Sequence, residues 1–407
     1  MPKMTHAVVV RGELNGLGVI RSLARAGIPT VLVDTTRARA AAWSRFCDFQ
    51  RVERLYGAGL VDDLLALQAR LGERPVLILT DEMAVTTVSQ YRDRLAAAYR
   101  FALPAAEMVS RLGDKAQFQA FAEANGVPVP RAVALRQECD LAKLVDLRFP
   151  AIVKPADKRG VYFGETERIH RVADLAACTK LCDRLVRSAG ELVVQEWING
   201  PDSNIFFSLF HQGDDQLAIF SGRKLIVHPP GIGSTAFCVA AADEAAEIES
   251  LTRRFIALTQ YRGLGGLELK FDSVHRRFVV VEPTVGRTDW QEEIATLSGV
   301  NIPLAAYRYA MGLPPLPRTP QAPTAAWQAS ILHWRGRTAL PSRMRVFDGY
   351  WRLRDPLPAL VHYGTAIAKR LTRRRARHSI NVPQPAEAGT AASSITPNPT
   401  TVVENLP

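Results

Sequence analysis

Apolar runs alternate with amphipathic stretches over residues 1–110. Residues 6–10, 29–34 and 75–80 are short apolar runs typical of buried strands. Residues 17–27 carry apolar side chains at helical spacing and end in a glycine, which indicates a helix between the first two strands. Strands and a helix that alternate in this way predict a parallel α/β layer for residues 1–110.

The pattern changes at residue 111. Residues 110–135 predict a helix with a sharp end, because Asn125 and Gly126 stop it and two prolines then force an extended exit. The segments that follow mix strands with helices, and the mixture predicts an α+β body over residues 111–315. The predicted strands lie within 149–160, 191–210, 217–227, 265–272 and 277–286, and the predicted helices within 172–189 and 243–261.

The chain becomes proline-rich after residue 312. Residues 316–368 are expected to form a C-terminal extension. Residues 369–378, KRLTRRRARH, hold six basic side chains and a histidine with no acid. Residues 380–407 lack aromatic side chains and periodicity, so they cannot bury enough apolar surface to offset the entropy of ordering. The expected tail, 369–407, is therefore basic and then disordered.

The basic run 369–378 has three interpretations. It is a solvated tail, or it contacts an anionic lipid surface, or it binds nucleic acid. Aromatic side chains do not interleave with it, and the sequence holds no recognisable nucleic-acid-binding module. We therefore expect no nucleic-acid partner, and peripheral contact with an anionic membrane is the functional alternative to a solvated tail.

The composition is that of a soluble globular protein with two or three sub-domains. The 407 residues exceed what one hydrophobic core usually organises. The content of 47% apolar and 22% charged residues is ordinary for a soluble globular protein. The five cysteines are scattered, without the paired CxxC spacing of a zinc site or a disulfide framework. The sequence has no signal-peptide core and no uncharged apolar window of about 18 residues. These features predict a cytoplasmic protein.

Three glycines, Gly12, Gly16 and Gly18, surround the start of the first predicted helix. Their spacing is GxxxGxG, which departs from the GxGxxG fingerprint of dinucleotide-binding turns. Asp34 at the end of the second strand would suit a ribose, but an aspartate there is as often a turn former. An NAD-dependent oxidoreductase is therefore kept as an alternative, although no histidine has the setting of a catalytic group.

Two lysines are candidate phosphate ligands. Lys154 ends the apolar strand of FPAIVKP and precedes a glycine-containing loop, where a fixed positive charge and backbone N–H groups can hold a phosphate. Lys115 stands at the start of a helix, in LGDKAQF. Each lysine taken alone is as well explained by a side chain that ends its element and meets water.

Three glutamates lie in or at the end of apolar strands. Glu196, in VVQEWING, can accept hydrogen bonds from a ribose or pair with a nearby base. Glu268 and Glu282 fall on two strands of one expected hairpin, so both can point to the same face. Two facing carboxylates repel unless a hard cation lies between them, and Mg²⁺ bridging nucleotide phosphates is the usual occupant. The alternative is a charged pair on the solvent side.

Taken in order, these segments resemble the ATP-grasp superfamily in its carboxylate-amine ligase type, which is related to biotin carboxylase. The resemblance covers roughly residues 6–315. It implies a small α/β domain followed by two α+β lobes that hold ATP between them. The segment GDKAQFQAFAEANGVPVP resembles the helix whose lysine, here Lys115, reaches the ATP phosphates. FPAIVKP resembles the strand whose lysine, here Lys154, contacts the α and β phosphates.

The resemblance also implies a nucleotide hinge and two metal ligands. VVQEWING resembles the hinge, in which Glu196 would hold the adenine or ribose side and Trp197 and Ile198 would add backbone contacts. GLELKFD and VVVEPTVGR resemble the two strands that carry the magnesium-binding acids, at Glu268 and Glu282. The implied cofactors are ATP and Mg²⁺, with Mn²⁺ as a substitute.

The chain departs from the family pattern beside the second acid. The family commonly has ExNxR there, whereas this chain has Thr284 in place of the asparagine and an arginine one residue later, Arg287. A threonine hydroxyl is a weaker metal ligand than an amide oxygen, but Thr284 is kept with the metal-binding group. Arg287 would steady the transferred phosphoryl group, and Arg223 and Lys224 could meet the γ-phosphate or the substrate carboxylate.

The implied activity joins a small-molecule carboxylate to a small-molecule amine. ATP would phosphorylate the carboxylate, and the amine would displace the phosphate to give an amide. Such a reaction depends mainly on positioning and charge neutralisation. A catalytically weak nucleotide-binding scaffold at the membrane face is the non-enzyme alternative, because Thr284 replaces the usual asparagine. Dimers are frequent among relatives, so a homodimer is one open assembly.

Overall fold

The computed structural model describes most of the chain and divides it into two compact units. The first unit is Met1–His362 and the second is Tyr363–Pro407. The described residues are 4–156, 170–189, 191–231, 233–318, 321–322, 324–330, 340 and 344–380. The thin glycine loop expected after Lys154, with Gly160 and Gly164, lies outside them, and so do residues 381–407 of the predicted disordered end.

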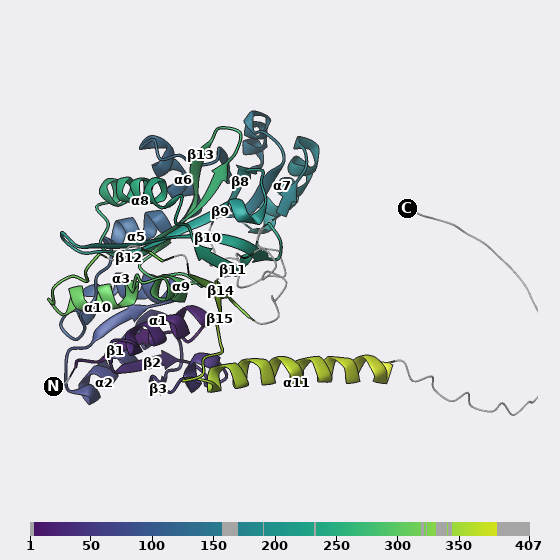
Figure 1. Ribbon diagram of the computed structural model, residues 1–407. Coiled ribbons are helices and arrows are strands. Elements are labelled where there is room, and N and C mark those ends of the chain that lie inside the picture. The colour runs from purple at the N-terminus through teal and green to yellow at the C-terminus, as the bar shows by residue number, and fades with distance from the viewer. Residues whose placement is uncertain are drawn as a thin grey trace, which may run out of the picture. The chain divides into compact units, whose positions relative to one another are not determined.

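A parallel sheet of order β3-β2-β1-β4 forms the first layer, as the sequence predicts (Figure 1). Three of its strands are the predicted apolar runs: β1 (Ala7–Val10), β2 (Thr30–Asp34) and β4 (Val76–Leu79). The edge strand β3 (Asp48–Arg51) is polar and partly exposed, so hydrophobicity does not reveal it. The layer's helical segments are α1 (Leu14–Ala24), η1 (Ala40–Trp43), α2 (Gly57–Leu71), α3 (Glu82–Gln90) and α4 (Arg92–Ala96).

Two helices, α5 (Ala106–Gly113) and α6 (Lys115–Ala124), occupy the segment for which the sequence predicts one. The single helix is wrong because Asp114 has extended backbone and caps α6, accepting a hydrogen bond from the Gln117 N–H at 2.8 Å. The predicted stop is confirmed, since α6 ends before Asn125 and Gly126 adopts a positive φ of 63°.

A four-stranded antiparallel sheet follows, with the order β5-β8-β6-β7. One face packs on a helix through Leu135, Val153 and Val194, and Figure 1 shows α7 beside this sheet. The other face carries Lys154 and meets α6 through Ala116. Its elements are β5 (Ala132–Leu135), η2 (Glu138–Asp146), β6 (Ala151–Pro155), β7 (His170–Val172), α7 (Leu175–Ala189) and β8 (Leu192–Glu196).

A seven-stranded sheet of order β13-β12-β9-β10-β11-β14-β15 is the largest layer. Its last two strands come from the expected extension 316–368, so the sheet continues beyond the boundary predicted at residue 315. The strands are β9 (Ile205–Gln212), β10 (Leu217–His228), β11 (Ser234–Ala240), β12 (Gly263–Asp272), β13 (Arg277–Val285), β14 (Ala325–Gln328) and β15 (Arg345–Asp348). The helical segments that accompany them are η4 (Asp202–Asn204), α8 (Ala245–Thr259), α9 (Glu293–Leu297) and α10 (Ile302–Ala310).

Alternate side chains of this sheet enter two different cores. Phe206 and Leu267 belong to a core that also includes α8, whereas Phe207 and Phe220 belong to the core around α1 and α10. Because Glu268 is adjacent to Leu267 in β12, it points to the Phe207 side of the sheet.

The helix α11 (Leu357–Ile380) contains the basic run 369–378, for which the sequence predicts charge but no helix. Within the described part of the chain, no helix combines the length and apolar character needed to cross a membrane.

Candidate active site

Glu268 and Glu282 are direct cross-strand partners. The antiparallel register of β12 and β13 places Glu268 opposite Glu282 and Gly266 opposite Thr284. A register shift follows Glu268, where β13 holds one extra residue. The expectation that the two carboxylates share a face is confirmed, and Thr284 follows on that face two residues later.

Lys224 on β10 reaches the same carboxylate. Its Nζ donates a hydrogen bond to Glu268 Oε2, and the lysine side chain is only 4% exposed. Burial by itself lowers the pKa of Lys224, but the negative charges of Glu268 and Asp289 outweigh it and raise the pKa. Lys224 is therefore a fixed positive charge beside one member of the glutamate pair.

Lys270 is a second buried cation, which the sequence motifs do not single out. It lies two residues after Glu268, and the strand alternation that places it on the same face is the signal that could have found it. Its Nζ is 4.1 Å from the centroid of the Trp197 ring. Burial lowers the pKa of Lys270, while the carboxylates of Asp202 and Glu268 oppose that effect.

The two predicted phosphate-binding lysines lie close to each other in the four-stranded layer. Lys154 is 5% exposed, and its Nζ donates to Gln195 Oε1 at 2.9 Å. The backbone N–H of Lys115 donates to the carbonyl of Ala156, two residues after Lys154, at 3.3 Å. Gln195 is not among the sequence candidates, yet it orients the Lys154 ammonium and contacts Gln119 of α6 at 3.5 Å.

The predicted hinge residues lie at the end of β8, which Glu196 closes, and directly after it. Glu196 Oε1 accepts the Arg148 N–H at 2.9 Å, and the Trp197 N–H donates to the Pro150 carbonyl at 3.0 Å. The Trp197 N–H is thus already engaged within the chain. Ile198 is half-buried. The Trp197 ring extends from this segment to Lys270 and so links the four-stranded layer to the seven-stranded sheet.

Arg223 and Lys224 are not brought together, although they are adjacent in sequence. Neighbouring side chains of a strand point to opposite faces. Arg223 Nε donates to the Ser203 carbonyl at 2.6 Å, and its guanidinium lies 5.2 Å from the Phe206 ring centroid, on the side away from Glu268. The structure therefore separates Arg223 from the glutamate pair.

Arg287 lies in the segment that follows β13. Its Nη1 donates to the Thr288 carbonyl at 3.0 Å and is 3.6 Å from Asp289 Oδ1. Asp289 also raises the pKa of Lys224, so Arg287 belongs to the charged group around Lys224. The Arg287 side chain is 17% exposed, which leaves part of its guanidinium accessible.

The glycine turn at the start of α1 serves internal structure. Asp34 is fully buried, and its carboxylate accepts the Gly12 N–H at 2.6 Å and the Thr35 N–H at 2.6 Å. A Cβ on Gly18 would come within 2.7 Å of Glu292, so Gly18 permits close contact between α1 and α9. Because the Asp34 carboxylate is buried and engaged in these hydrogen bonds, it does not act as the ribose-binding acid that a dinucleotide site requires.

The oxygen ligands in this region fit a magnesium ion. Mg²⁺ is commonly held by one or two carboxylates together with waters and substrate phosphates. Glu268 and Glu282 supply two facing carboxylates and Thr284 a hydroxyl. Among the described residues, no group of three or more His, Cys, Asp or Glu side chains could hold a metal on its own. Two carboxylates and a hydroxyl make up only part of the usual ligand set of Mg²⁺.

Comparison with known proteins gives relatives at low sequence identity. No protein-family model matches the sequence. D-aspartate ligase of Enterococcus faecium is 21% identical over 240 residues, which are 56% of this chain and 56% of the relative. Carnosine synthase 1 of Homo sapiens is 29% identical over 136 residues, 32% of this chain and 16% of the relative. The chain thus spans little more than half the length of one curated relative and a small part of the other.

Solved structures match over most of the chain. N5-carboxyaminoimidazole synthetase of Staphylococcus aureus superposes with a TM-score of 0.60 and 14% identity, over 77% of this chain and 78% of that one. The biotin carboxylase domain of Hydrogenobacter thermophilus 2-oxoglutarate carboxylase, a dimer in complex with MgADP and bicarbonate, gives 0.62 and 15%, over 80% and 74%. Both are ATP-grasp enzymes. The chain therefore shares the fold of these enzymes, as its sequence motifs predict.

Proposed function

We propose that this protein is an ATP-dependent carboxylate-amine ligase. A small-molecule carboxylate attacks the γ-phosphate of ATP to form an acyl phosphate and release ADP. An amine then attacks the acyl carbon and loses a proton, which gives an amide and inorganic phosphate. The names D-aspartate ligase and carnosine synthase support this class of reaction, as do the ATP-grasp enzymes that share the fold. The similarity covers only part of each of the two curated relatives, so the identities of the acid and the amine are to be determined by assay.

The four-stranded layer would bind the nucleotide. Lys154 and Lys115 would neutralise the ATP phosphates. Gln195 orients the Lys154 ammonium, and the Lys115 N–H donates to the carbonyl of Ala156, two residues after Lys154. Glu196 would face the ribose or adenine. Trp197 and Ile198 would border the base, and the contact between the Trp197 ring and Lys270 would keep the two layers in register around it.

The seven-stranded sheet would bind the metal and the reacting groups. Glu268, Glu282 and Thr284 would hold Mg²⁺ or Mn²⁺, which when bound neutralises the phosphate oxygens. Lys224 and Arg287 would meet the γ-phosphate and the acyl phosphate, where their fixed charges would offset the negative charge that develops. Arg223 faces the other side of the sheet, so we leave it out of this group.

The observation that carries the proposal is the register of Glu268 with Glu282 within an ATP-grasp fold. Two carboxylates that face each other on neighbouring strands, with Lys224 beside them, form a charged arrangement that a solvent-facing pair would not need. The biotin carboxylase domain with bound MgADP is a dimer, so a homodimer is the first assembly to test.

The test is magnesium-dependent ADP release by the full chain with pooled amino acids, including D-aspartate, dipeptides and uronic acids. Stimulated release that is lost in Glu282→Gln supports the ligase. The matched control is Glu247→Gln, on the exposed side of α8, which should leave the rate unchanged. Failure of ADP to bind the wild-type protein would overturn the proposal.

A nucleotide-binding scaffold is the second candidate. The contact of Lys224 with Glu268 favours it, because an ammonium on that carboxylate competes with a metal ion. Nucleotide binding without stimulated ADP release from any pool would support the scaffold, and release with any one pool would exclude it.

A further inference from the structure

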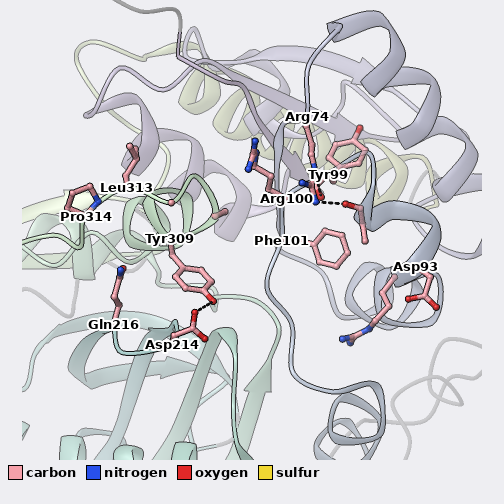
Figure 2. A pocket seen from close by; sticks show the side chains of 14 residues that line it. Arg74, Asp93, Tyr99, Arg100, Phe101, Asp214, Gln216, Tyr309, Leu313 and Pro314 are labelled. Carbon is pink, nitrogen blue, oxygen red and sulfur yellow. Dashed lines mark hydrogen bonds between the residues drawn. The ribbon is translucent and has the colours of Figure 1, made fainter.

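A cavity of about 860 Å³ lies at the amino end of β4, away from the candidate active site. Figure 2 shows Arg74 and Arg100 on one side of it and Asp214 and Tyr309 on another. We call it the arginine pocket, after three lining residues, Arg74, Arg92 and Arg100.

The arginine pocket is distant from the glutamate pair. Gln216, at the start of β10, lines it, whereas Lys224 lies eight residues further along. At about 3.3 Å per strand residue, roughly 26 Å separate these positions. Strand β4 also leads from the pocket towards the active site. Arg74, which lines the pocket, precedes the strand, and the carbonyl of Thr80, which follows it, accepts a hydrogen bond from Asn15 on the active-site side. A ligand in the pocket would not be part of the nucleotide site.

Arg100 carries the strongest sign of a ligand. Its Nε is buried and has no hydrogen-bond partner among the residues that the structure describes. An arginine has five N–H donors and no acceptor, and a buried donor without a partner is costly. Arg100 also forms no ion pair within the described part of the chain, so no carboxylate there neutralises its charge beside the pocket that it lines.

Backbone carbonyls hold the other two arginines in place. Arg74 donates to the carbonyls of Tyr99, at 3.3 Å, and Ala96, and Arg92 donates to the Pro104 carbonyl at 2.7 Å. These neutral acceptors fix each guanidinium without cancelling its charge. Neither arginine has a carboxylate within ion-pair distance in the described residues.

The acidic residues of the pocket do not balance this charge. Asp214 forms an ion pair with Arg262 and accepts the Tyr309 hydroxyl at 3.0 Å. Of the acids that line the pocket, Asp93 is then left to offset the charge of the three arginines, so the pocket carries an excess of positive charge. The rings of Phe101 and Tyr309 and the side chain of Leu313 provide apolar surface beside the charges.

We propose that the arginine pocket binds a small phosphate ester or diphosphate. Planar guanidinium groups match phosphate oxygens in pairs, and several of them together suit a multiply charged oxyanion. The apolar wall would contact the organic part of the ligand. The pocket is therefore a second anion site, separate in position from the proposed nucleotide site.

The experiment is calorimetric titration of the full chain with inorganic pyrophosphate and, separately, with ADP, without magnesium and at constant ionic strength. Arg100→Gln should weaken pyrophosphate binding at least tenfold and leave ADP binding unchanged. Lys154→Gln should weaken ADP binding and leave an Arg100-dependent pyrophosphate site. Arg54→Gln, an exposed arginine outside the pocket, is the matched control for loss of one charge.

Unchanged pyrophosphate binding in Arg100→Gln would overturn the proposal, and so would an equal loss in Arg54→Gln. If Arg100→Gln fails to fold, as judged by circular dichroism, Arg92→Gln provides the same comparison. If wild-type protein binds pyrophosphate through Arg100 but does not bind ADP, the pocket stands and the ligase proposal fails.

Discussion

Glu282 lies directly opposite Glu268 across β12 and β13, and the Lys224 ammonium contacts the Glu268 carboxylate from β10. Two facing carboxylates place negative charge at one point of the sheet surface and so attract a cation. Lys224 supplies one positive charge from the protein itself. In the proposed enzyme, magnesium would supply the remainder when the nucleotide binds.

Replacing Glu268 by Gln should reduce magnesium-dependent ADP release about a hundredfold, a typical loss when one charge-stabilising group is removed from an active site. The amide keeps the size of the side chain but removes half of the carboxylate pair. The measurement is the initial rate of ADP formation at saturating ATP. Glu247→Gln is again the matched control, and a Glu268→Gln enzyme that keeps more than a tenth of the rate would contradict the assignment.

Replacing Lys224 by Met should lower stability by about 2 kcal/mol, measured by urea unfolding. Breaking a fully buried ion pair costs about 3–5 kcal/mol. The cost here should be lower, because Glu268 is 36% exposed and water can solvate it once the ammonium is gone. A variant as stable as the wild type would show that the contact between Lys224 and Glu268 does not stabilise the fold.

Replacing Asp355 by Ala should destabilise the body by about 3 kcal/mol in the same assay. The Asp355 carboxylate is buried and accepts hydrogen bonds from Arg21 Nε, Ser44 Oγ and the Arg45 N–H, each at 3.0 Å. Its removal leaves Arg21 buried without the carboxylate to which its Nε donates, and Glu293, at 3.9 Å, then forms the one ion pair that Arg21 keeps in the described part of the chain. This pair joins the extension to the N-terminal layer.

The control for Asp355 is Asp62→Ala, which removes an exposed ion pair with Arg94 and should cost less than about 1 kcal/mol. Equal losses in the two variants would show that the buried contacts around Asp355 add nothing beyond the removal of an acid.

The apolar strands and the facing glutamates could be predicted because both follow from strand periodicity. An uninterrupted run such as 76–79 is buried on both faces, and two-residue alternation fixes the face of Glu268. The same alternation separates Arg223 from Lys224. The prediction that both residues contact the same ligand group ignored that neighbouring side chains of a strand point to opposite faces.

Other features depend on contacts between distant segments and have no local pattern. The strand 345–348 is assigned only by its pairing with 325–328, and Gln195 matters only because Lys154 lies beside it on the neighbouring strand. The arginine pocket is likewise built from side chains more than a hundred residues apart, such as Arg100 and Tyr309. The spacing of these residues along the sequence does not indicate that they lie close together in the fold.

Glu292 should make the protein less stable as pH rises from about 5 to about 8. Burial, and secondarily the charge of Glu293, raises the pKa of Glu292 from an ordinary value of 4.5 to about 8. Ser22 Oγ donates to its carboxyl at 3.1 Å, but this bond does not offset the burial. Below pH 4.5 both the folded and the unfolded chain hold the proton, so this residue contributes no pH dependence there.

Between the two pKa values the unfolded chain has released the Glu292 proton while the folded chain still holds it, so rising pH favours unfolding by about 4–5 kcal/mol across this interval. Glu292→Gln mimics the protonated form and should remove this part of the slope. Urea unfolding of both proteins at several pH values gives the difference, in which other titrating groups cancel. The variant should gain on the wild type as pH rises towards 8; a constant difference would mean that Glu292 is ionised in the folded protein throughout, with its charge balanced by neighbours such as Arg25.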